Sequence, residues 1–153
     1  MDAIVARAMA KWPDVPAVYG WLALDRRGGW RIKGEKIRHA ALSEFIARNY
    51  DVDAMGRWYF QNGPQRVYVD LAYTPLVVHY EGGALLDHCA RAFAPLARYL
   101  DDEGSVLFAA GRAVALLDDR DLARIADEAE GFERILRADV AVRFGFVPAP
   151  RPG

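Results

Sequence analysis

A pattern that occurs twice in the chain limits the folds open to it. Residues 24–28 read LDRRG and residues 100–104 read LDDEG, and in both places a short β-rich run, a glycine and a helical stretch follow. The two copies are offset by about 75 residues, which is long enough for one supersecondary unit. We therefore predict an α+β fold of two similar ββαββ halves, residues 17–83 and 84–147, related by internal duplication and made mainly of antiparallel sheet.

The remaining segments lie outside the two predicted halves. Residues 1–16 form a predicted N-terminal helix, since apolar residues recur there at helical spacing until Pro13. Residues 148–153 read PAPRPG, which suits neither a helix nor a sheet, so we expect a flexible tail. Because one half of this size buries little surface, we expect the two halves to pack together.

The composition is that of an ordinary globular protein. Hydrophobic residues make up 53% of the 153 residues and the formal net charge is −1, so no excess of positive charge favours nucleic acid as a partner. Cys89 is the only cysteine, which excludes an intrachain disulfide. The N-terminus does not read as a secretory signal, and no apolar run reaches the roughly 20 residues that cross a bilayer. We therefore predict a cytoplasmic protein without a membrane partner.

The segment 56–70, GRWYFQNGPQRVYVD, predicts a β-hairpin with a polar tip. A two-residue turn centred on Asn62 and Gly63 is disfavoured, because Pro64 has no N–H to close it. We expect a longer loop instead, with Pro64 at the second position of a turn over residues 63–66. Gln61, Asn62 and Gln65 then either project as a stiff recognition element or satisfy the backbone of their own loop.

This tip has no counterpart in the second half, where residues 136–139 read LRAD. The asymmetry indicates that the tip carries something that the fold alone does not require. The predicted contact residues for a ligand or partner are the polar and basic residues of this hairpin, with two arginines of the first turn as anion contacts: Arg57, Gln61, Asn62, Gln65, Arg66, Arg26 and Arg27.

A local basic patch on the first predicted hairpin offers a second kind of site. Its members are Arg26, Arg27, Lys33, Lys36 and Arg38. The neighbouring glycines match neither a Walker loop nor a dinucleotide fingerprint. The patch favours contact with a small anion, while contact with single-stranded nucleic acid is the weaker interpretation.

Other reactive residues are better explained by structural roles. His39, His79, His88 and Cys89 show no metal-ligand spacing, so we predict neither a metal nor a cofactor. Because His88 and Cys89 are adjacent, their side chains point in different directions, which argues against a catalytic pair. The acidic clusters at 101–103 and 118–121 fall at expected turns and helix starts, where capping explains them.

Three strings of the sequence carry a resemblance to a known group of proteins. They are DRRGGW, FIARNY and GRWYFQNGPQRVYVDLAYTP. Together they resemble an uncharacterised, mainly proteobacterial protein family of unknown function. The resemblance implies no activity, cofactor or catalytic residue.

Two function classes remain open. The favoured hypothesis is a non-enzymatic binding or regulatory protein, whose partner is a protein or a small anionic ligand. The alternative is a small enzyme with a cleft between the two halves, in which Arg57 or Arg66 holds an anionic substrate and Asp70 or His79 acts as acid or base. A strand edge or aromatic patch that is left uncovered would favour a homodimer.

Overall fold

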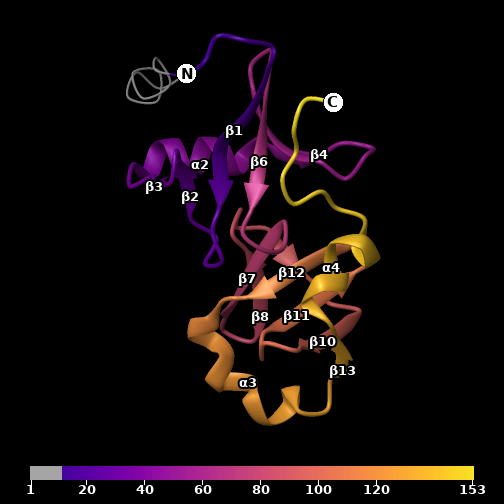
Figure 1. The fold of residues 1–153 in the computed structure, drawn as a ribbon. Coiled ribbons are helices and arrows are strands. Elements are labelled where there is room, and N and C mark those ends of the chain that lie inside the picture. Colours follow the sequence, from indigo (N-terminus) through magenta and orange to yellow (C-terminus); the bar gives the residue numbers. More distant parts are fainter. Residues whose placement is uncertain (1–11) are drawn as a thin grey trace.

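The computed structural model describes residues 12–153, which form two β-sheets placed end to end (Figure 1). Residues 1–11 of the predicted N-terminal helix lie outside the described residues, and residues 12–16 are not helical. The chain passes from the first sheet to the second through residues 72–75. None of the helices in the described part of the chain is long and apolar enough to span a membrane.

The first sheet has six strands in the order β3-β2-β1-β6-β5-β4. Its two central strands are parallel, and every other neighbouring pair is antiparallel. One helix, α2, connects the two outer strands. The elements are β1 (Ala17–Leu24), β2 (Trp30–Ile32), β3 (Glu35–Lys36), α2 (Ala40–Arg48), β4 (Tyr50–Val52), β5 (Trp58–Asn62) and β6 (Gln65–Leu71).

The second sheet has seven strands in the order β13-β10-β11-β12-β7-β8-β9. The pairs β12·β7 and β10·β13 are parallel and the others are antiparallel. The elements are β7 (Leu76–Glu81), β8 (Ala84–Asp87), β9 (Ala92–Phe93), β10 (Ala97–Asp101), β11 (Val106–Ala110), β12 (Ala113–Leu117), a 3-10 helix (Asp119–Asp121), α3 (Leu122–Ala129), β13 (Glu133–Ile135) and α4 (Arg137–Phe144).

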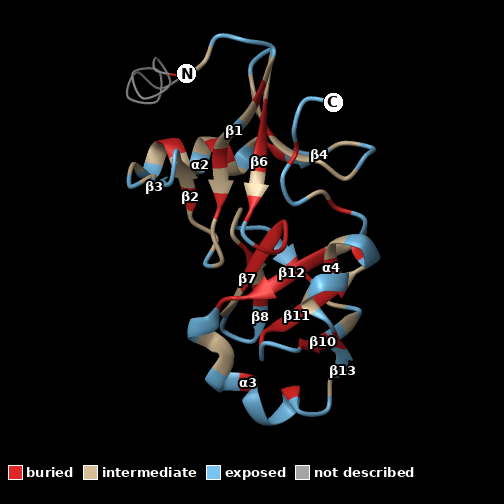
Figure 2. Ribbon diagram, in the orientation of Figure 1, coloured by how far each residue is buried: buried red, intermediate tan, exposed pale blue. Residues whose placement is uncertain are grey.

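The core follows from simple periodicities in the sequence. Each α-helix buries two apolar residues four positions apart, such as Leu42 and Ile46 in α2 or Val140 and Phe144 in α4. The most buried strands are β11 and β12 of the second sheet, which Figure 2 shows largely in red, and Phe60 of β5 and Phe108 of β11 are among the fully buried side chains. One continuous hydrophobic cluster runs through both sheets.

One type of turn recurs in both sheets. The carboxylates of Asp25, Asp53, Asp87 and Asp101 each accept hydrogen bonds from the backbone N–H groups two and four residues later. The residue three positions after each aspartate has a positive φ, and it is glycine in three of these turns. The repeated LDRRG and LDDEG strings therefore encode the same aspartate-stabilised hairpin turn.

The strand order is also shared between the two sheets. The consecutive strands β1 to β6 and β7 to β12 are arranged in the same order, and in each set the first and sixth strands pair in parallel at the centre. The prediction of a mainly antiparallel sheet is wrong, because both sheets are mixed. β7, which the sequence placed in the first half, pairs with β12 of the second sheet.

The C-terminal region differs from the sequence expectation in two respects. The second half was expected to end in a strand pair with residues 136–139 as its turn, but residues 137–144 form α4, in which Val140 and Phe144 are buried four positions apart and Gly145 ends the helix with a φ of 71°. The tail is held against β6: Leu71 N–H donates to the Pro148 carbonyl at 2.8 Å, and Arg151 pairs with Asp70 at 2.7 Å.

Candidate functional site

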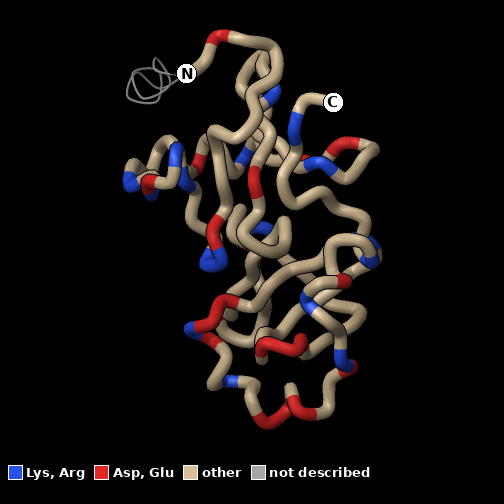
Figure 3. The backbone as a smooth tube through the Cα atoms, in the orientation of Figure 1, with Lys and Arg blue, Asp and Glu red and all other residues tan. Residues whose placement is uncertain are grey.

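A cleft of about 690 Å³ opens between the two sheets. One wall is the β1–β2 turn with neighbouring residues of β2 and β3, and the other is the end of β12 with the segment that follows it. Figure 3 shows the basic β1–β2 turn facing the acidic segment after β12. Leu116, Leu117 and Leu122 supply an apolar part of the lining. A cleft of this size accommodates a small organic molecule.

Positive charge predominates in the cleft. Its lining contains two carboxylates, Asp25 and Asp119, and five cationic side chains: Arg26, Arg27, Arg31, Lys36 and Arg120. Three of these cations have carboxylate partners: Arg31 pairs with Asp25, Arg27 with Asp119 and Arg120 with the adjacent Asp118. No carboxylate within residues 12–153 forms an ion pair with Arg26 or Lys36.

Arg26 is oriented by uncharged partners. Its Nη2 donates to Ser105 Oγ of the second sheet at 2.9 Å, and its guanidinium lies 5.1 Å from the centre of the Tyr73 ring. The Tyr73 hydroxyl in turn donates to Asp101 at 2.7 Å. Burial and then this hydrogen bond raise the pKa of Tyr73, so its hydroxyl keeps its proton. The charge of Arg26 is thus fixed in position without being neutralised.

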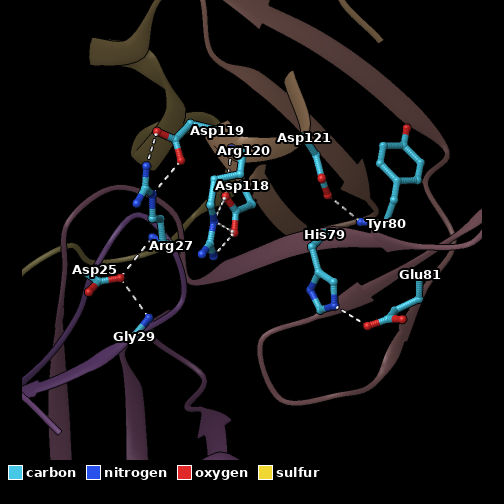
Figure 4. A network of polar contacts seen from close by, with 10 residues as sticks. All are labelled: Asp25, Arg27, Gly29, His79, Tyr80, Glu81, Asp118, Asp119, Arg120 and Asp121. Atoms are coloured by element: carbon cyan, nitrogen blue, oxygen red, sulfur yellow. Dashed lines mark hydrogen bonds and ion pairs between the residues drawn. The ribbon is translucent and has the colours of Figure 1, made fainter. Parts of the chain in front are cut away.

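Arg27 joins the two walls of the cleft through a two-point ion pair. Its Nε donates to Asp119 Oδ1 at 2.8 Å, and its Nη2 donates to Asp119 Oδ2 at 3.1 Å (Figure 4). The hydrogen bond from Arg27 lowers the pKa of Asp119, so the carboxylate is ionised at neutral pH. Both side chains are more than half exposed to solvent, at 56% and 60%.

A second cleft of about 390 Å³ shares Arg27, Gly28 and Arg120 with the first. Its lining includes Asp118, which is buried and accepts hydrogen bonds from the backbone and side chain of Arg120. The side-chain hydrogen bond from Arg120 lowers the pKa of Asp118. Asp121 accepts from Tyr80 N–H at 2.8 Å, which ties the segment after β12 to β7 (Figure 4).

His88 lines the second cleft and packs against the β1–β2 turn at Gly28. Its Nδ1 accepts from Val77 N–H at 3.2 Å, its Nε2 is buried without a partner, and its ring packs edge-on against Trp30 and Tyr50. Burial lowers the pKa of His88 to about 3, so the ring is neutral at physiological pH. A Cβ on Gly28 would lie 2.6 Å from the His88 Cβ, so this close approach requires glycine.

Three N–H groups of the β1–β2 turn are engaged within the turn itself. Arg27 and Gly29 donate their N–H groups to the Asp25 carboxylate, and Gly28 donates its N–H to the Asp25 carbonyl. The lining cations Arg26 and Lys36 are therefore better placed than these three amides to contact an anion. A phosphate-binding loop that uses free amides is a different arrangement.

The amides of the predicted recognition tip are engaged by the hairpin itself and by the chain before β1. Gln61 donates to the carbonyls of Gly63 and Gln65, Asn62 donates to the Gln65 side chain, and Gln65 donates to the carbonyls of Pro13 and Val15. These contacts match the alternative in which the amides satisfy their own loop. They stabilise the hairpin and its attachment to the chain before β1.

The longer loop predicted at this tip is wrong. Asn62 pairs directly with Gln65, so the connection is a two-residue turn with Gly63 and Pro64 at its centre. Gly63 has a φ of 56°. Since proline fixes φ near about −65° at the second central position, the geometry matches a type II′ turn. The observed turn lies one residue earlier in the chain than the predicted one.

The other predicted contact residues lie away from the cleft lining. Arg57 pairs with Asp53 at 2.8 Å and lies over the Tyr68 ring, while Arg66 lies 3.8 Å from the centre of the Tyr59 ring. Of the proposed acid and base residues, Asp70 is paired with Arg151 and His79 lies 3.1 Å from Glu81. The structure does not assemble these residues into one catalytic group.

The remaining candidate ligands have structural roles. His39 caps α2 by accepting from Leu42 N–H, and burial raises the pKa of the Cys89 thiol to about 12. Within residues 12–153, no group of three or more histidine, cysteine or acidic side chains is placed to hold a metal ion.

The sequence did not predict the residues of the second wall of the cleft. Ser105 gave no signal, and Asp119 and Arg120 belonged to a segment that capping explained. The one available signal was the alternation of charge in residues 118–121, which read DDRD.

Comparisons with known proteins place the chain in a family. The fold is similar to a DUF1285 family protein from Silicibacter pomeroyi DSS-3, with a TM-score of 0.55 and 18% identity over 83% of this chain and 84% of that chain. It is also similar to a DUF1285 family protein from Shewanella baltica OS155, with a TM-score of 0.52 and 14% identity over 70% and 91%. A search of curated proteins found no match. Residues 1–151 match the family DUF2944, described as "Protein of unknown function (DUF2946)", and the chain belongs to that family.

Proposed function

We propose that the protein is a non-enzymatic binding protein that holds a small anionic ligand in the cleft between the two sheets. The observation that carries this proposal is the excess of cationic over acidic side chains in the cleft, with Arg26 and Lys36 lacking a carboxylate partner in the described structure. Arginine in a partly enclosed site suits carboxylate and phosphate groups.

The chemistry of the cleft favours binding over turnover. Asp25 is engaged by three donors from its own turn and strand, and Asp119 is paired with Arg27. Tyr73 keeps its proton at neutral pH because its pKa is raised. None of these groups is free to exchange a proton with a bound molecule near pH about 7.

The experiment compares two variants that remove the same charge. Isothermal titration calorimetry at fixed ionic strength measures the binding of phenyl phosphate, benzenesulfonate and benzoate. Lys36→Gln removes an exposed cation of the cleft, and Arg112→Gln removes an exposed cation outside its lining. We expect Lys36→Gln to weaken binding on the order of threefold, and Arg112→Gln to leave it unchanged. Equal affinities for both variants, or no binding of any probe by the wild-type protein, would contradict the proposal.

We further propose that the two sheets descend from one duplicated unit. The shared strand order of β1–β6 and β7–β12 supports this, as does the aspartate-stabilised turn at equivalent places in that order, on Asp53 between β4 and β5 and on Asp101 between β10 and β11. In this view the cleft lies at the junction of the two copies. A homodimer in the cytoplasm remains our prediction for the protein in the cell, and light scattering measures its oligomeric state.

A further inference from the structure

The Asp119 carboxylate is bound by the Arg27 guanidinium in the geometry of a bound anion. Its two carboxylate oxygens receive separate hydrogen bonds from Nε and Nη2 of the guanidinium, at 2.8 and 3.1 Å. This is the two-point geometry by which arginine binds a carboxylate or phosphate group of a ligand. The two residues come from opposite walls of the cleft (Figure 4). Asp119 therefore marks the place where a ligand's charged group meets Arg27.

The Asp119 side chain can leave this place without loss of the local fold. The segment after β12 is held by its neighbours: Asp118 caps the 3-10 helix through Arg120 N–H, and Asp121 accepts from Tyr80 N–H. Within residues 12–153, the Asp119 carboxylate accepts hydrogen bonds from the Arg27 side chain and from no backbone N–H group. Since Arg27 and Asp119 are both more than half exposed, solvent screens their ion pair and its contribution is small.

Charge determines which anions gain from replacing Asp119. A single carboxylate that displaces Asp119 exchanges one negative charge for another at Arg27. A phosphate monoester carries about two negative charges above pH about 6 and has three acceptor oxygens. It can therefore also be attracted by Arg26 and Lys36, which have no carboxylate partner within residues 12–153.

We propose that the ligand of the cleft is a phosphate-bearing small molecule whose dianionic group displaces Asp119 from Arg27. Asp119 is then an internal competitor for the ligand site, and it holds Arg27 in a binding-ready position when the ligand is absent. This inference rests on the proposed function of the cleft. It adds the class of the ligand and the residue that the ligand replaces.

The test uses Asp119→Asn, which removes the charge of the competitor and keeps its shape. Asp127→Asn is the matched control, since Asp127 is an exposed acid of α3 outside the cleft lining. Calorimetry at about pH 8, where phosphate monoesters are dianionic, compares phenyl phosphate with benzenesulfonate and benzoate at constant ionic strength. We expect the wild-type protein to prefer phenyl phosphate. We also expect Asp119→Asn to tighten its binding on the order of threefold, while Asp127→Asn leaves it unchanged.

The outcomes separate this inference from the proposed function. If phenyl phosphate binds and depends on Lys36, but Asp119→Asn leaves its affinity unchanged or lowers it, then Asp119 is no competitor and this inference is wrong, while the proposed function stands. If benzoate or benzenesulfonate binds the wild-type protein as tightly as phenyl phosphate, the ligand class is wrong. If neither the wild-type protein nor Asp119→Asn binds any of the three probes, the proposed function fails as well.

Discussion

The guanidinium of Arg26 donates a hydrogen bond to Ser105 Oγ at 2.9 Å and so joins two hairpin turns that are 79 residues apart in the sequence. Both turns are of the same aspartate-stabilised type, built on Asp25 and Asp101. The contact connects the two sheets at the edge of the cleft and fixes a cation there. The stability of the protein and the charge of its candidate site therefore depend on the same pair.

The first prediction concerns this pair. Ser105→Ala removes the acceptor of a partly buried hydrogen bond to a charged group, so we expect the free energy of unfolding to fall by about 1 kcal/mol. Urea denaturation followed by tryptophan fluorescence measures the change. Ser43→Ala, a partly exposed substitution on α2, is the control and is expected to have a much smaller effect. Equal effects of the two substitutions would show that the Arg26 contact contributes nothing.

The second prediction concerns the close approach of Gly28 to His88. Gly28 and Gly34 have nearly equal φ values of 80° and 84°, but only a Cβ on Gly28 would collide, at 2.6 Å from the His88 Cβ. Gly34→Ala is expected to cost about 1 kcal/mol from backbone strain alone. Gly28→Ala adds a steric clash in a packed region, for a total of about 2–4 kcal/mol. Equal losses of unfolding free energy would contradict the packing of the turn against His88.

The third prediction is a dependence of stability on pH. The pKa of His88 is about 3 in the folded protein, below its value of about 6.5 in the unfolded chain. The unfolded chain therefore binds more protons between these values, and stability falls as the pH drops below about 6.5, by up to about 1.4 kcal/mol per pH unit. His88→Asn, which keeps an acceptor near Val77 N–H, is expected to reduce this slope between about pH 6.5 and pH 4.5. Urea denaturation across the pH range measures both proteins, and identical slopes would contradict the burial of a neutral His88.

The fourth prediction concerns the polar tip of the β5–β6 hairpin. Gln65 donates to the carbonyls of Pro13 and Val15, whereas Asn62 donates only to the Gln65 side chain. We therefore expect Gln65→Ala to lower the free energy of unfolding by about 1–2 kcal/mol and Asn62→Ala to lower it by less than about 1 kcal/mol. Phenyl phosphate binding should be unchanged in both variants. A loss of phenyl phosphate binding with an intact fold would show that the tip is part of the binding site.

Local features of the fold were accessible from the sequence. The helical stretch expected after LDRRG corresponds to α2, and the segment 56–70 forms the expected β5–β6 hairpin. A helix and a hairpin of this kind are formed by residues that are close in the sequence, so local patterns predict them. The turn at Gly63 and Pro64 was misplaced by one residue, because a type II′ turn accepts a proline that a type I′ turn does not. The expected repeat placed a turn at residues 136–139 between two strands, whereas residues 137–144 form α4.

The candidate site was accessible only in part. Arg26 and Arg27 were recognised as anion contacts from their glycine turn, but their partners Ser105 and Asp119 lie 79 and 92 residues away. Such contacts follow from the end-to-end placement of the two sheets, which local sequence patterns do not encode. Polar residues in a turn either bind a partner or satisfy the backbone of their own loop, and the sequence does not distinguish these roles. The contacts of Gln65 with the carbonyls of Pro13 and Val15, about 50 residues earlier in the chain, are seen only in the folded structure.

The central claim is that the cleft between the two sheets binds a small anion, and an NMR titration of the full chain with phenyl phosphate tests it most directly. The amide N–H groups of Arg27 and Gly29 report on the cleft because both donate to Asp25 beside it. We predict saturable chemical-shift changes at these amides and at residues 105 and 119–120, with little change at residues 61–66. Changes confined to residues 61–66, or no saturable change at the cleft, would contradict the account.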